Sequence, residues 1–332
     1  MWKEVAAFIQ THQTFLVTTH LNPEGDAIGC EIALMEFLEN QGKKVFIVNS
    51  DATPKNCRFL DPNSRIQVYD PSDRPDIFRE IDGIFIVDVN SWQHVGEITK
   101  AIRESGKPRV CIDHHQGGST DIADIFIRDT SAASAGVLIS ELIQYMNGRF
   151  TRPIADALYS SLITDTGTFR FSNTDSRAFA LAEALVKHGA DPFTLHRLVF
   201  ASRTWAAARL LGPVLSTIES AADGKLVWFH VTGDMFKQTG AEYEDCDGFI
   251  DLVRGIQGVE LCLFFKETVD GAIKLSLRSN GRVDAFEIAK EMGGGGHKMA
   301  AGVNLEGSME RVIEDVVRRC LRSPVFNPTL RS

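Results

Sequence analysis

The sequence lacks the features that mark disulfide-rich, zinc-cluster and membrane proteins. Its 332 residues include six cysteines, and no two of them form a Cys-x-x-Cys pair. Scattered cysteines of this kind favour reduced thiols and argue against a zinc cluster or a disulfide framework. No apolar run approaches the roughly 20 residues that a transmembrane helix needs. We therefore expect a globular protein whose stability comes from its core.

The sequence has fewer basic than acidic residues. It contains 35 Lys and Arg residues and 44 Asp and Glu residues, which gives a formal net charge of −9. Proteins that coat long nucleic acid spread Lys and Arg over one face, so this balance argues against that class. A small phosphate compound remains compatible, because a metal-lined cleft with a few arginines can bind it. The N-terminal segment has an acid, Glu4, in its first turn and no signal-peptide cleavage site, which predicts a cytoplasmic protein.

The length favours two domains, each with a core of its own. In the first part of the chain, short apolar runs alternate with helical patterns, which predicts an α/β fold with a doubly wound, mainly parallel sheet. We expect a first domain at 1–190, a helical linker at 191–215 and a smaller α/β domain at 216–325. The second domain should contain strands at Leu226–Val231, Val259–Phe265 and Ile273–Arg278 and a last amphipathic helix at Met309–Leu321.

Apolar runs that end in acids or imidazoles are the main functional signal of the first part. Phe15–Thr19 leads to His20, Gly83–Val87 leads to Asp88, and Arg109–Ile112 leads to Asp113, His114 and His115. In open parallel sheets, ligands bind beyond the carboxyl ends of the strands, so these polar side chains are expected to lie near one another.

A fourth apolar run, Leu158–Ile163, leads to Asp165. It fits either a strand or the end of a helix, and both interpretations place Asp165 at the start of a Gly-containing loop. Phe169 and Phe171 in that loop are more typical of packing residues than of platforms for base stacking.

The turn after His20 adds two acids, Glu24 and Asp26. Either acid alone would more simply be a helix cap or a solvated residue, but together with His20 they favour a common site. Oxygen and imidazole donors without thiolates are typical of sites for divalent ions such as Mn²⁺ or Mg²⁺. Two ions sharing a carboxylate would suit phosphoester hydrolysis, because they lower the pKa of a bridging water and neutralise phosphoryl charge.

The second part contains a glycine run, Gly293–Gly296, followed by His297. A backbone without Cβ atoms allows amide groups to approach an anion closely, although most Gly-rich tracts are flexible loops. Its position between a helix-like and a strand-like segment favours a binding role. Arg254 and Arg278 fit either an exposed position or a ligand contact.

Taken in order, these motifs resemble those of the DHH-family phosphoesterases, in particular the bacterial nanoRNase/pAp phosphatase branch. The resemblance covers nearly the whole chain. It implies a catalytic DHH domain, a smaller DHH-associated C-terminal domain and an active-site cleft between them. The matching segments are His20-Leu21-Asn22-Pro23-Glu24-Gly25-Asp26, Val87-Asp88, Asp113-His114-His115, Thr164-Asp165-Thr166-Gly167 and Gly293-Gly294-Gly295-Gly296-His297.

The resemblance also implies roles for single residues. One manganese ion would be held by His20, Glu24 and Asp88, and the other by Asp26, Asp88, His114 and Asp165, with Mg²⁺ or Co²⁺ as substitutes. Asp88 would bridge the two ions, Asp113 would orient an imidazole, and His115 would face the scissile phosphate. Arg278 and His297 would bind the nucleotide, and the other expected substrate-binding residues are Arg254, Gly294, Gly295 and Gly296.

One position departs from the family pattern. Relatives usually carry Asp where this chain has Glu24, so a shifted loop or a different ligation geometry must absorb the additional methylene group. Glutamate still supplies oxygen ligands, and activity is expected to survive. The occupancy of that metal site and the preferred ion remain open.

The expected activity is the Mn-dependent hydrolysis of short oligoribonucleotides, including linear dinucleotides, to mononucleotides, together with conversion of 3′-phosphoadenosine 5′-phosphate (pAp) to AMP. A cyclic-dinucleotide phosphodiesterase is an alternative, although such enzymes commonly carry membrane or sensory segments. A non-catalytic nucleotide-binding protein is another, and the intact remaining ligands argue against it. A homodimer is left open.

Overall fold

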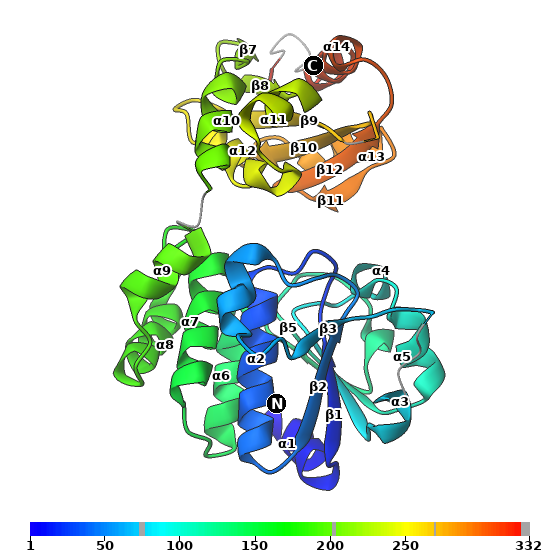
Figure 1. Cartoon of the computed structure of the whole chain (residues 1–332), viewed down its shortest axis with the longest axis vertical. Coiled ribbons are helices and arrows are strands. Elements are labelled where there is room, and N and C mark those ends of the chain that lie inside the picture. Colours follow the sequence, from blue (N-terminus) through cyan, green and yellow to red (C-terminus); the bar gives the residue numbers. More distant parts are fainter. Residues whose placement is uncertain (73–76, 201–203, 269, 327–332) are drawn as a thin grey trace. The chain divides into compact units, whose positions relative to one another are not determined.

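A computed structural model describes residues 1–72, 77–200, 204–268 and 270–326 of the chain. The chain folds into two compact units, Met1–Ser202 and Arg203–Ser332, both drawn in Figure 1. The boundary falls inside the segment expected to be the linker, 191–215. Among the described residues, no helix has both the length and the apolar character needed to cross a membrane.

The first unit is built on six parallel strands in the order β3-β2-β1-β4-β5-β6 (Figure 1). The chain winds outward in both directions from β1 and β4, so the predicted doubly wound parallel sheet is confirmed. The strands are β1 Thr14–Thr18, β2 Lys44–Asn49, β3 Ile66–Val68, β4 Gly83–Val87, β5 Arg109–Asp113 and β6 Ile125–Arg128.

Helices cover both faces of this sheet. Because strand residues alternate between faces, Phe15 and Val17 join one apolar core and Leu16 joins another. The first core lies under α1 Trp2–Thr11, α2 Gly25–Asn40, α6 Ala135–Tyr145, α7 Arg152–Asp165, α8 Ser176–Lys187 and α9 Pro192–Phe200. The second lies under α3 Ile77–Glu80, α4 Trp92–Val95 and α5 Thr99–Ser105, and short 3-10 helices lie at η1 Lys55–Leu60 and η2 Thr120–Ile122.

The segment before Asp165 is a helix, which decides between the two interpretations of its sequence. Thr151 caps the start of α7, and a proline occupies its first turn, as is common at helix N-termini. Helix α7 packs closely on its neighbours: a Cβ atom on Gly29 of α2 would overlap the carbonyl of Ala157, and one on Gly136 of α6 would overlap the Ser161 hydroxyl. Glycine at these two positions lets α2, α6 and α7 pack closely against one another.

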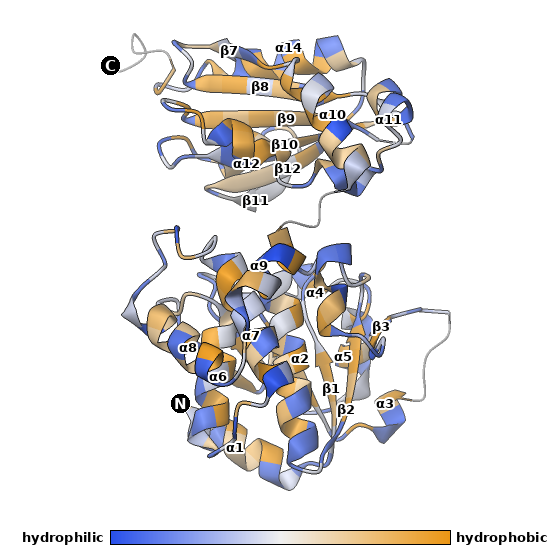
Figure 2. Cartoon of the chain, turned by 60° about the vertical axis from the view of Figure 1, so that its left-hand side comes forward, coloured by the Kyte–Doolittle hydropathy of each residue, from blue (hydrophilic) through white to orange (hydrophobic). Residues whose placement is uncertain are grey.

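The second unit is built on a mixed sheet in the order β11-β12-β10-β9-β8-β7, in which β8 and β9 are parallel and the other pairs are antiparallel. Figure 2 shows the hydrophobic character of β8 and β9 in its interior. The strands are β7 Glu219–Ala221, β8 Leu226–Val231, β9 Leu261–Glu267, β10 Ile273–Ser279, β11 Gly295–His297 and β12 Ala300–Leu305.

Two helical layers cover this second sheet as well. One face carries α10 Trp205–Leu215, α11 Gly233–Thr239, η3 Tyr243–Cys246 and α12 Phe249–Arg254. The other carries α13 Ala285–Lys290 and α14 Met309–Cys320. The three strands and the last amphipathic helix predicted from the sequence are present, whereas β7 and β11 were not foreseen, because each is only three residues long.

Candidate active site

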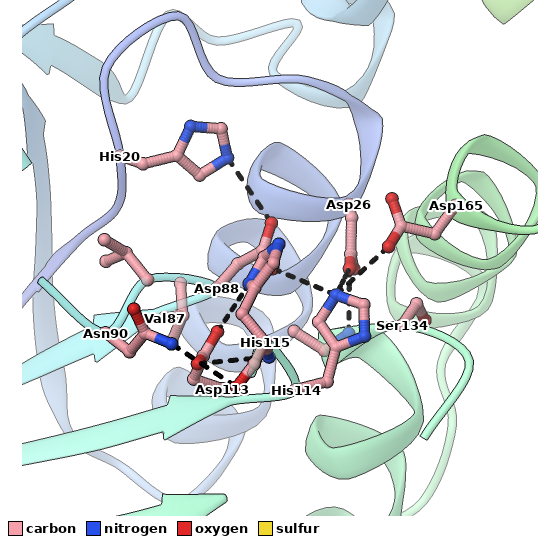
Figure 3. Close-up of polar contacts among 12 residues, drawn as sticks. His20, Asp26, Val87, Asp88, Asn90, Asp113, His114, His115, Ser134 and Asp165 are labelled. Atoms are coloured by element: carbon pink, nitrogen blue, oxygen red, sulfur yellow. Dashed lines mark hydrogen bonds and ion pairs between the residues drawn. The ribbon is translucent and has the colours of Figure 1, made fainter. Parts of the chain in front are cut away.

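Polar side chains of the first unit gather at the carboxyl ends of β1, β4 and β5 (Figure 3). His20 lies two residues beyond β1, Asp88 directly follows β4, and Asp113 is the last residue of β5. These three strands are adjacent and parallel, so their ends meet at one edge of the sheet. Two helices add an acid each, because Asp26 lies in the first turn of α2 and Asp165 ends α7.

Asp88 is the centre of this group. One of its carboxylate oxygens lies 3.4 Å from His20 Nε2, and the other lies 3.5 Å from His114 Nε2 and 3.6 Å from His115 Nδ1. Its φ of 58° is unusual for a residue other than glycine, although Asp tolerates it better than most. Backbone strain of this kind clusters at functional sites. Here it turns the chain sharply at the end of β4 and leaves the carboxylate among three imidazoles.

Main-chain carbonyls orient the two most buried imidazoles. His20 Nδ1 donates to the carbonyl of Leu21 at 2.8 Å, and His114 Nδ1 donates to the carbonyl of Ala132 at 3.1 Å. In each ring the proton on Nδ1 leaves Nε2 facing the carboxylates. Such a partner commonly fixes the tautomer and orientation of a metal-binding histidine.

His114 Nε2 also connects the group to the helices. It lies 3.1 Å from an oxygen of Asp165 and 3.6 Å from an oxygen of Asp26. Three of the predicted acids, Asp26, Asp88 and Asp165, therefore converge around one nitrogen atom.

Asp26 is held by the start of α6 and by α7. Its carboxylate accepts the backbone N–H groups of Ala135 at 2.8 Å and Gly136 at 3.1 Å, and the hydroxyl of Ser161 at 2.6 Å. The free amide groups and the dipole of a helix N-terminus stabilise a carboxylate in this position. The sequence predicts a helix from Ser134 onward, but neither its first backbone N–H groups nor Ser161 were expected to contact Asp26. The small residues at 134–136 before an apolar helix are the local signal of such a start, but they do not reveal which carboxylate they hold.

Asp113 orients His115, which is the imidazole left for the substrate in the expected roles. Its carboxylate lies 2.8 Å from His115 Nδ1 and accepts the His115 backbone N–H at 3.2 Å. The buried Asn90 donates to the carbonyls of His115 at 3.3 Å and Gly117 at 3.4 Å, and so fixes the same loop. The His115 side chain is 43% exposed against 11% for His114, so His115 is the accessible one.

Two further acids, Glu24 at the N-cap of α2 and Glu31 within the helix, bear on the site. Glu24 is the exposed N-cap residue of the helix, and its charge helps to raise the pKa of both His20 and Asp165. Glu31 was not singled out from the sequence. It is fully buried and accepts a hydrogen bond from Asn49 at 2.9 Å, and burial raises its pKa to about 8 despite that bond.

The charges of the site compensate one another. Burial, followed by the charges of Asp88 and Asp165, raises the pKa of Asp26 well above its usual range. Burial would also raise the pKa of Asp88, but the hydrogen bond with His20 and the imidazole charges outweigh it and lower that pKa. Burial would lower the pKa values of His20 and His114, yet the carboxylates raise them to about 9 and about 10. The carboxylates therefore attract positive charge, which protons or metal ions can supply.

The donor set fits divalent metal ions. Among the described residues, one group of ligand atoms within 4.8 Å of one another comes from Asp88, His114 and His115, and another from Asp26, His114 and Asp165. Asp88 Oδ1 and His114 Nε2 are buried and have no hydrogen-bond partner among these residues. Leaving buried polar atoms unsatisfied is costly, and a cation would satisfy both. Oxygen and imidazole ligands suit Mg²⁺ and Mn²⁺.

The glycine run of the second unit has a structural use. The N–H groups of Gly293 and Gly294 donate to the carbonyls of Lys290 and Ala289, at 3.0 and 2.8 Å, and so close the end of α13. A Cβ atom on Gly294 or Gly296 would overlap the backbone of β12, whereas one on Gly295 would meet nothing within 4 Å. Close packing of β11 on β12 thus explains two of the glycines, and anion binding by the run stays a prediction.

The two predicted arginines of the second unit lie near each other. Arg278 on β10 pairs with Cys262 on β9, and Arg254 ends α12, which packs on the same strands. Burial raises the pKa of Cys262 to about 12, and the charges of both arginines oppose this rise. Arg254 forms an ion pair with Asp251 at 3.0 Å. The side chain of His297 lies outside the described part of the structure.

Comparison with known proteins gives family matches over both units. Residues 14–162 match the DHH family, N-terminal domain, and residues 225–322 match the DHHA1 domain. The chain is 33% identical to the bifunctional oligoribonuclease and PAP phosphatase NrnA of Thermus thermophilus, covering 92% of this chain and 90% of the relative. It is 25% identical to the cyclic-di-AMP phosphodiesterase PdeA of Listeria monocytogenes, covering 90% of this chain and 45% of the relative.

Solved structures share the fold over the whole chain. An exopolyphosphatase-related protein from Bacteroides fragilis superimposes with a TM-score of 0.93 at 26% identity, covering 100% of this chain and 97% of the other. The exonuclease RecJ bound to manganese superimposes with a TM-score of 0.57 at 14% identity, covering 99% and 97%. The second similarity is one of fold alone.

Proposed function

We propose, because this chain belongs to the DHH family, that it hydrolyses phosphoester bonds of short oligoribonucleotides and of pAp, and that its catalytic unit is the first one. The similarity to a bifunctional oligoribonuclease and PAP phosphatase supports these two substrates. The observation that carries the proposal is the convergence of Asp26, Asp88, His114 and Asp165 at the carboxyl edge of the sheet.

In the proposed reaction two divalent ions are held by side chains of this edge. One is assigned to Asp26, Asp88, His114 and Asp165, and the other to His20, Glu24 and Asp88. When bound, such a pair supplies a water of lowered pKa and positive charge for the phosphoryl oxygens. We favour Mn²⁺ over Mg²⁺ because imidazoles form part of the donor set, and Mg²⁺ prefers oxygen ligands and water.

His115 and Asp113 are assigned to proton transfer and positioning. Asp113 holds Nδ1 of His115, which leaves the exposed Nε2 free to contact the phosphate or to protonate the leaving oxygen. Asn90 keeps the loop of His115 in place. In the second unit, Arg278, Arg254, His297 and the glycines at 294–296 are assigned to nucleotide binding. The position of both arginines near Cys262 supports this part of the proposal.

The test is a time course with end-labelled di- to pentaribonucleotides and pAp in Mn²⁺, Mg²⁺ or Co²⁺. The wild type should release mononucleotides and AMP, and the Asp88→Ala variant should lose at least about 10³-fold in kcat/KM. Asp234→Ala, which removes an exposed carboxylate of the second unit, is the matched control and should behave as the wild type. Equal turnover by Asp88→Ala and the wild type would refute the assignment.

A cyclic-dinucleotide phosphodiesterase is the second candidate, because the similarity to PdeA spans 90% of this chain. Rates on cyclic and linear dinucleotides of the same base, measured side by side, separate the two. The leading proposal requires the linear substrate to be hydrolysed faster.

A further inference from the structure

The loop that follows α7 has a backbone conformation that is rare for its residues. Gly167, Thr168 and Phe169 have φ angles of 54°, 60° and 62°, so three successive residues lie in the left-handed region. Glycine adopts this region readily, but a β-branched residue such as Thr168 does so seldom. Strained backbone persists only where surrounding contacts impose it, and it concentrates at ligand clamps and active sites.

Hydrogen bonds of Thr166 hold this loop in its left-handed conformation. Its side chain is buried, and its hydroxyl donates to the carbonyl of Leu162 at 2.6 Å and accepts the N–H of Phe169 at 3.0 Å. Its carbonyl accepts the N–H groups of Arg170 at 2.9 Å and Phe171 at 3.0 Å. One buried residue thus fixes the backbone of the two residues that follow the strained segment.

Asn173 connects the end of this loop to Asp165 by a hydrogen bond. Its side-chain amide donates to the carbonyl of Asp165 at 3.0 Å and to the carbonyl of Ala133 at 2.9 Å. The loop therefore begins and ends at Asp165, one of the acids around His114. Arg170 and Phe171 lie within this closed loop, five and six residues after Asp165 in the sequence.

Arg170 is a cation whose charge is not offset by any carboxylate among the described residues. Its Nε donates to the carbonyl of Gly167 at 2.7 Å, and the residue is exposed. Among the described residues no carboxylate lies within ion-pair distance of it, whereas Arg177 on α8 pairs with Asp129 and Glu141. A guanidinium group oriented through Nε leaves its terminal N–H groups free, and these form the bidentate contact that phosphate accepts.

The two phenylalanines of the loop differ in environment. Phe169 packs against the core and stacks on Phe179, with ring centroids 5.2 Å apart, as the expected packing role requires. Phe171 is 47% exposed instead, and the outer end of its ring rests on Gly167, where a Cβ atom would overlap it. An exposed aromatic ring that is supported from below is a platform on which a base can stack.

We propose that Arg170 and Phe171 form a nucleotide subsite of the first unit, in which Arg170 binds a phosphate group and Phe171 stacks on a base. This inference rests on the proposed function and names residues that select a nucleotide over a simple phosphate. The strained loop fixes the backbone of both residues through the Thr166 carbonyl, and Asn173 ties the same loop to the carbonyl of Asp165. Neither residue takes part in bond cleavage, so their effect should fall on binding.

The test measures the dissociation constants of AMP and of inorganic phosphate for the Mn²⁺-loaded full chain by calorimetry. Phe171→Leu should weaken AMP binding about tenfold and leave phosphate binding unchanged, and Phe171→Trp should restore the wild-type value. Arg170→Ala should raise the dissociation constants of both AMP and phosphate about tenfold. With a linear dinucleotide as substrate, both variants should raise KM by a similar factor and keep kcat within about twofold.

Arg149→Ala and Tyr145→Leu serve as matched controls. Both residues are exposed. Tyr145 ends α6 and Arg149 lies between α6 and α7, whereas Arg170 follows the opposite end of α7. These variants should bind AMP and phosphate as the wild type does. Equal binding of AMP by wild type, Arg170→Ala and Phe171→Leu would overturn the subsite, and so would a loss of phosphate binding in Phe171→Leu.

The two proposals can fail separately. A wild type that binds AMP through Arg170 and Phe171 but hydrolyses neither dinucleotides nor pAp would refute the proposed function and support the subsite. A wild type that hydrolyses both substrates with unchanged KM in the two variants would do the reverse.

Discussion

The two units of the molecule bury polar groups in different ways. The first unit buries the carboxylates of Asp26, Glu31, Asp88 and Asp113, together with amides and hydroxyls that contact them. In the described part of the second unit the buried charged side chain is Lys266, which lies over the ring of Tyr243 at 4.3 Å. Burying charge is costly unless it is compensated. The acidic cluster of the first unit is thus a cost to folding that metal binding can offset.

The largest effect on the acidic cluster of the first unit should come from removing the imidazole of His114. His114 lies within reach of Asp26, Asp88 and Asp165, so His114→Ala should lower kcat/KM by at least about 10³-fold and remove high-affinity Mn²⁺ binding at the ion assigned to these residues. Steady-state kinetics and calorimetry with Mn²⁺ measure the two effects. His196→Ala, which removes an exposed imidazole of α9, is the control. Unchanged Mn²⁺ binding in His114→Ala would contradict the assignment of His114, Asp26, Asp88 and Asp165 to one ion.

Glu31 offers a test of the cost of buried charge through pH. Its pKa is raised by burial from 4.5 to about 8 in the folded protein, so the folded state keeps a proton that the unfolded state releases between these values. The stability of the wild type relative to Glu31→Gln should therefore fall as the pH rises from 4.5 to 8, by on the order of a few kcal/mol. Denaturant unfolding of both proteins in EDTA measures it. A constant difference from pH 5 to pH 9 would show that Glu31 does not titrate in this way.

Ser161 tests how much the support of Asp26 matters. Ser161→Ala removes the hydroxyl that donates to the carboxylate and should weaken Mn²⁺ binding about tenfold, as is typical when the partner of a metal ligand is lost. Ser160→Ala is closely matched, because this neighbouring buried hydroxyl donates to the carbonyl of Asp156 instead. Calorimetry with Mn²⁺ should separate the two variants. Equal affinities would mean that the start of α6 alone holds Asp26.

Lys266 is expected to give the smallest effect. Burial lowers the pKa of its ammonium group, and replacement by an apolar chain of similar length removes a buried charge without creating a cavity. Lys266→Met should change the free energy of unfolding by no more than about 1.5 kcal/mol and leave Mn²⁺ affinity within twofold. A loss of Mn²⁺ binding in this variant would show that metal binding is not a property of the first unit alone.

The fold and the centre of the site could be foreseen because their signals are local. Apolar runs that stop at His20, Asp88 and Asp113 mark strand ends, and parallel strands bring such ends to one edge. The same pattern could not settle whether the run before Asp165 was a strand or a helix, because a short apolar run fits both.

The residues that support the site could not be predicted, because their contacts join segments far apart in the sequence. Ser161 contacts Asp26 across 135 positions, and Glu31 meets Asn49 only through the packing of α2 on β2. The glycine run was interpreted as an anion cradle, yet the need for glycine at positions 294 and 296 comes from β12, whose backbone lies against them. In each case the deciding partner is set by tertiary packing.

The orientation of the His20 and His114 rings by main-chain carbonyls has a consequence for mutation. Every residue type offers the same carbonyl oxygen, so substitutions at Leu21 and Ala132 that preserve the backbone keep both rings aligned. The orientation of these imidazoles therefore does not depend on which side chain Leu21 or Ala132 carries, as long as the backbone is unchanged.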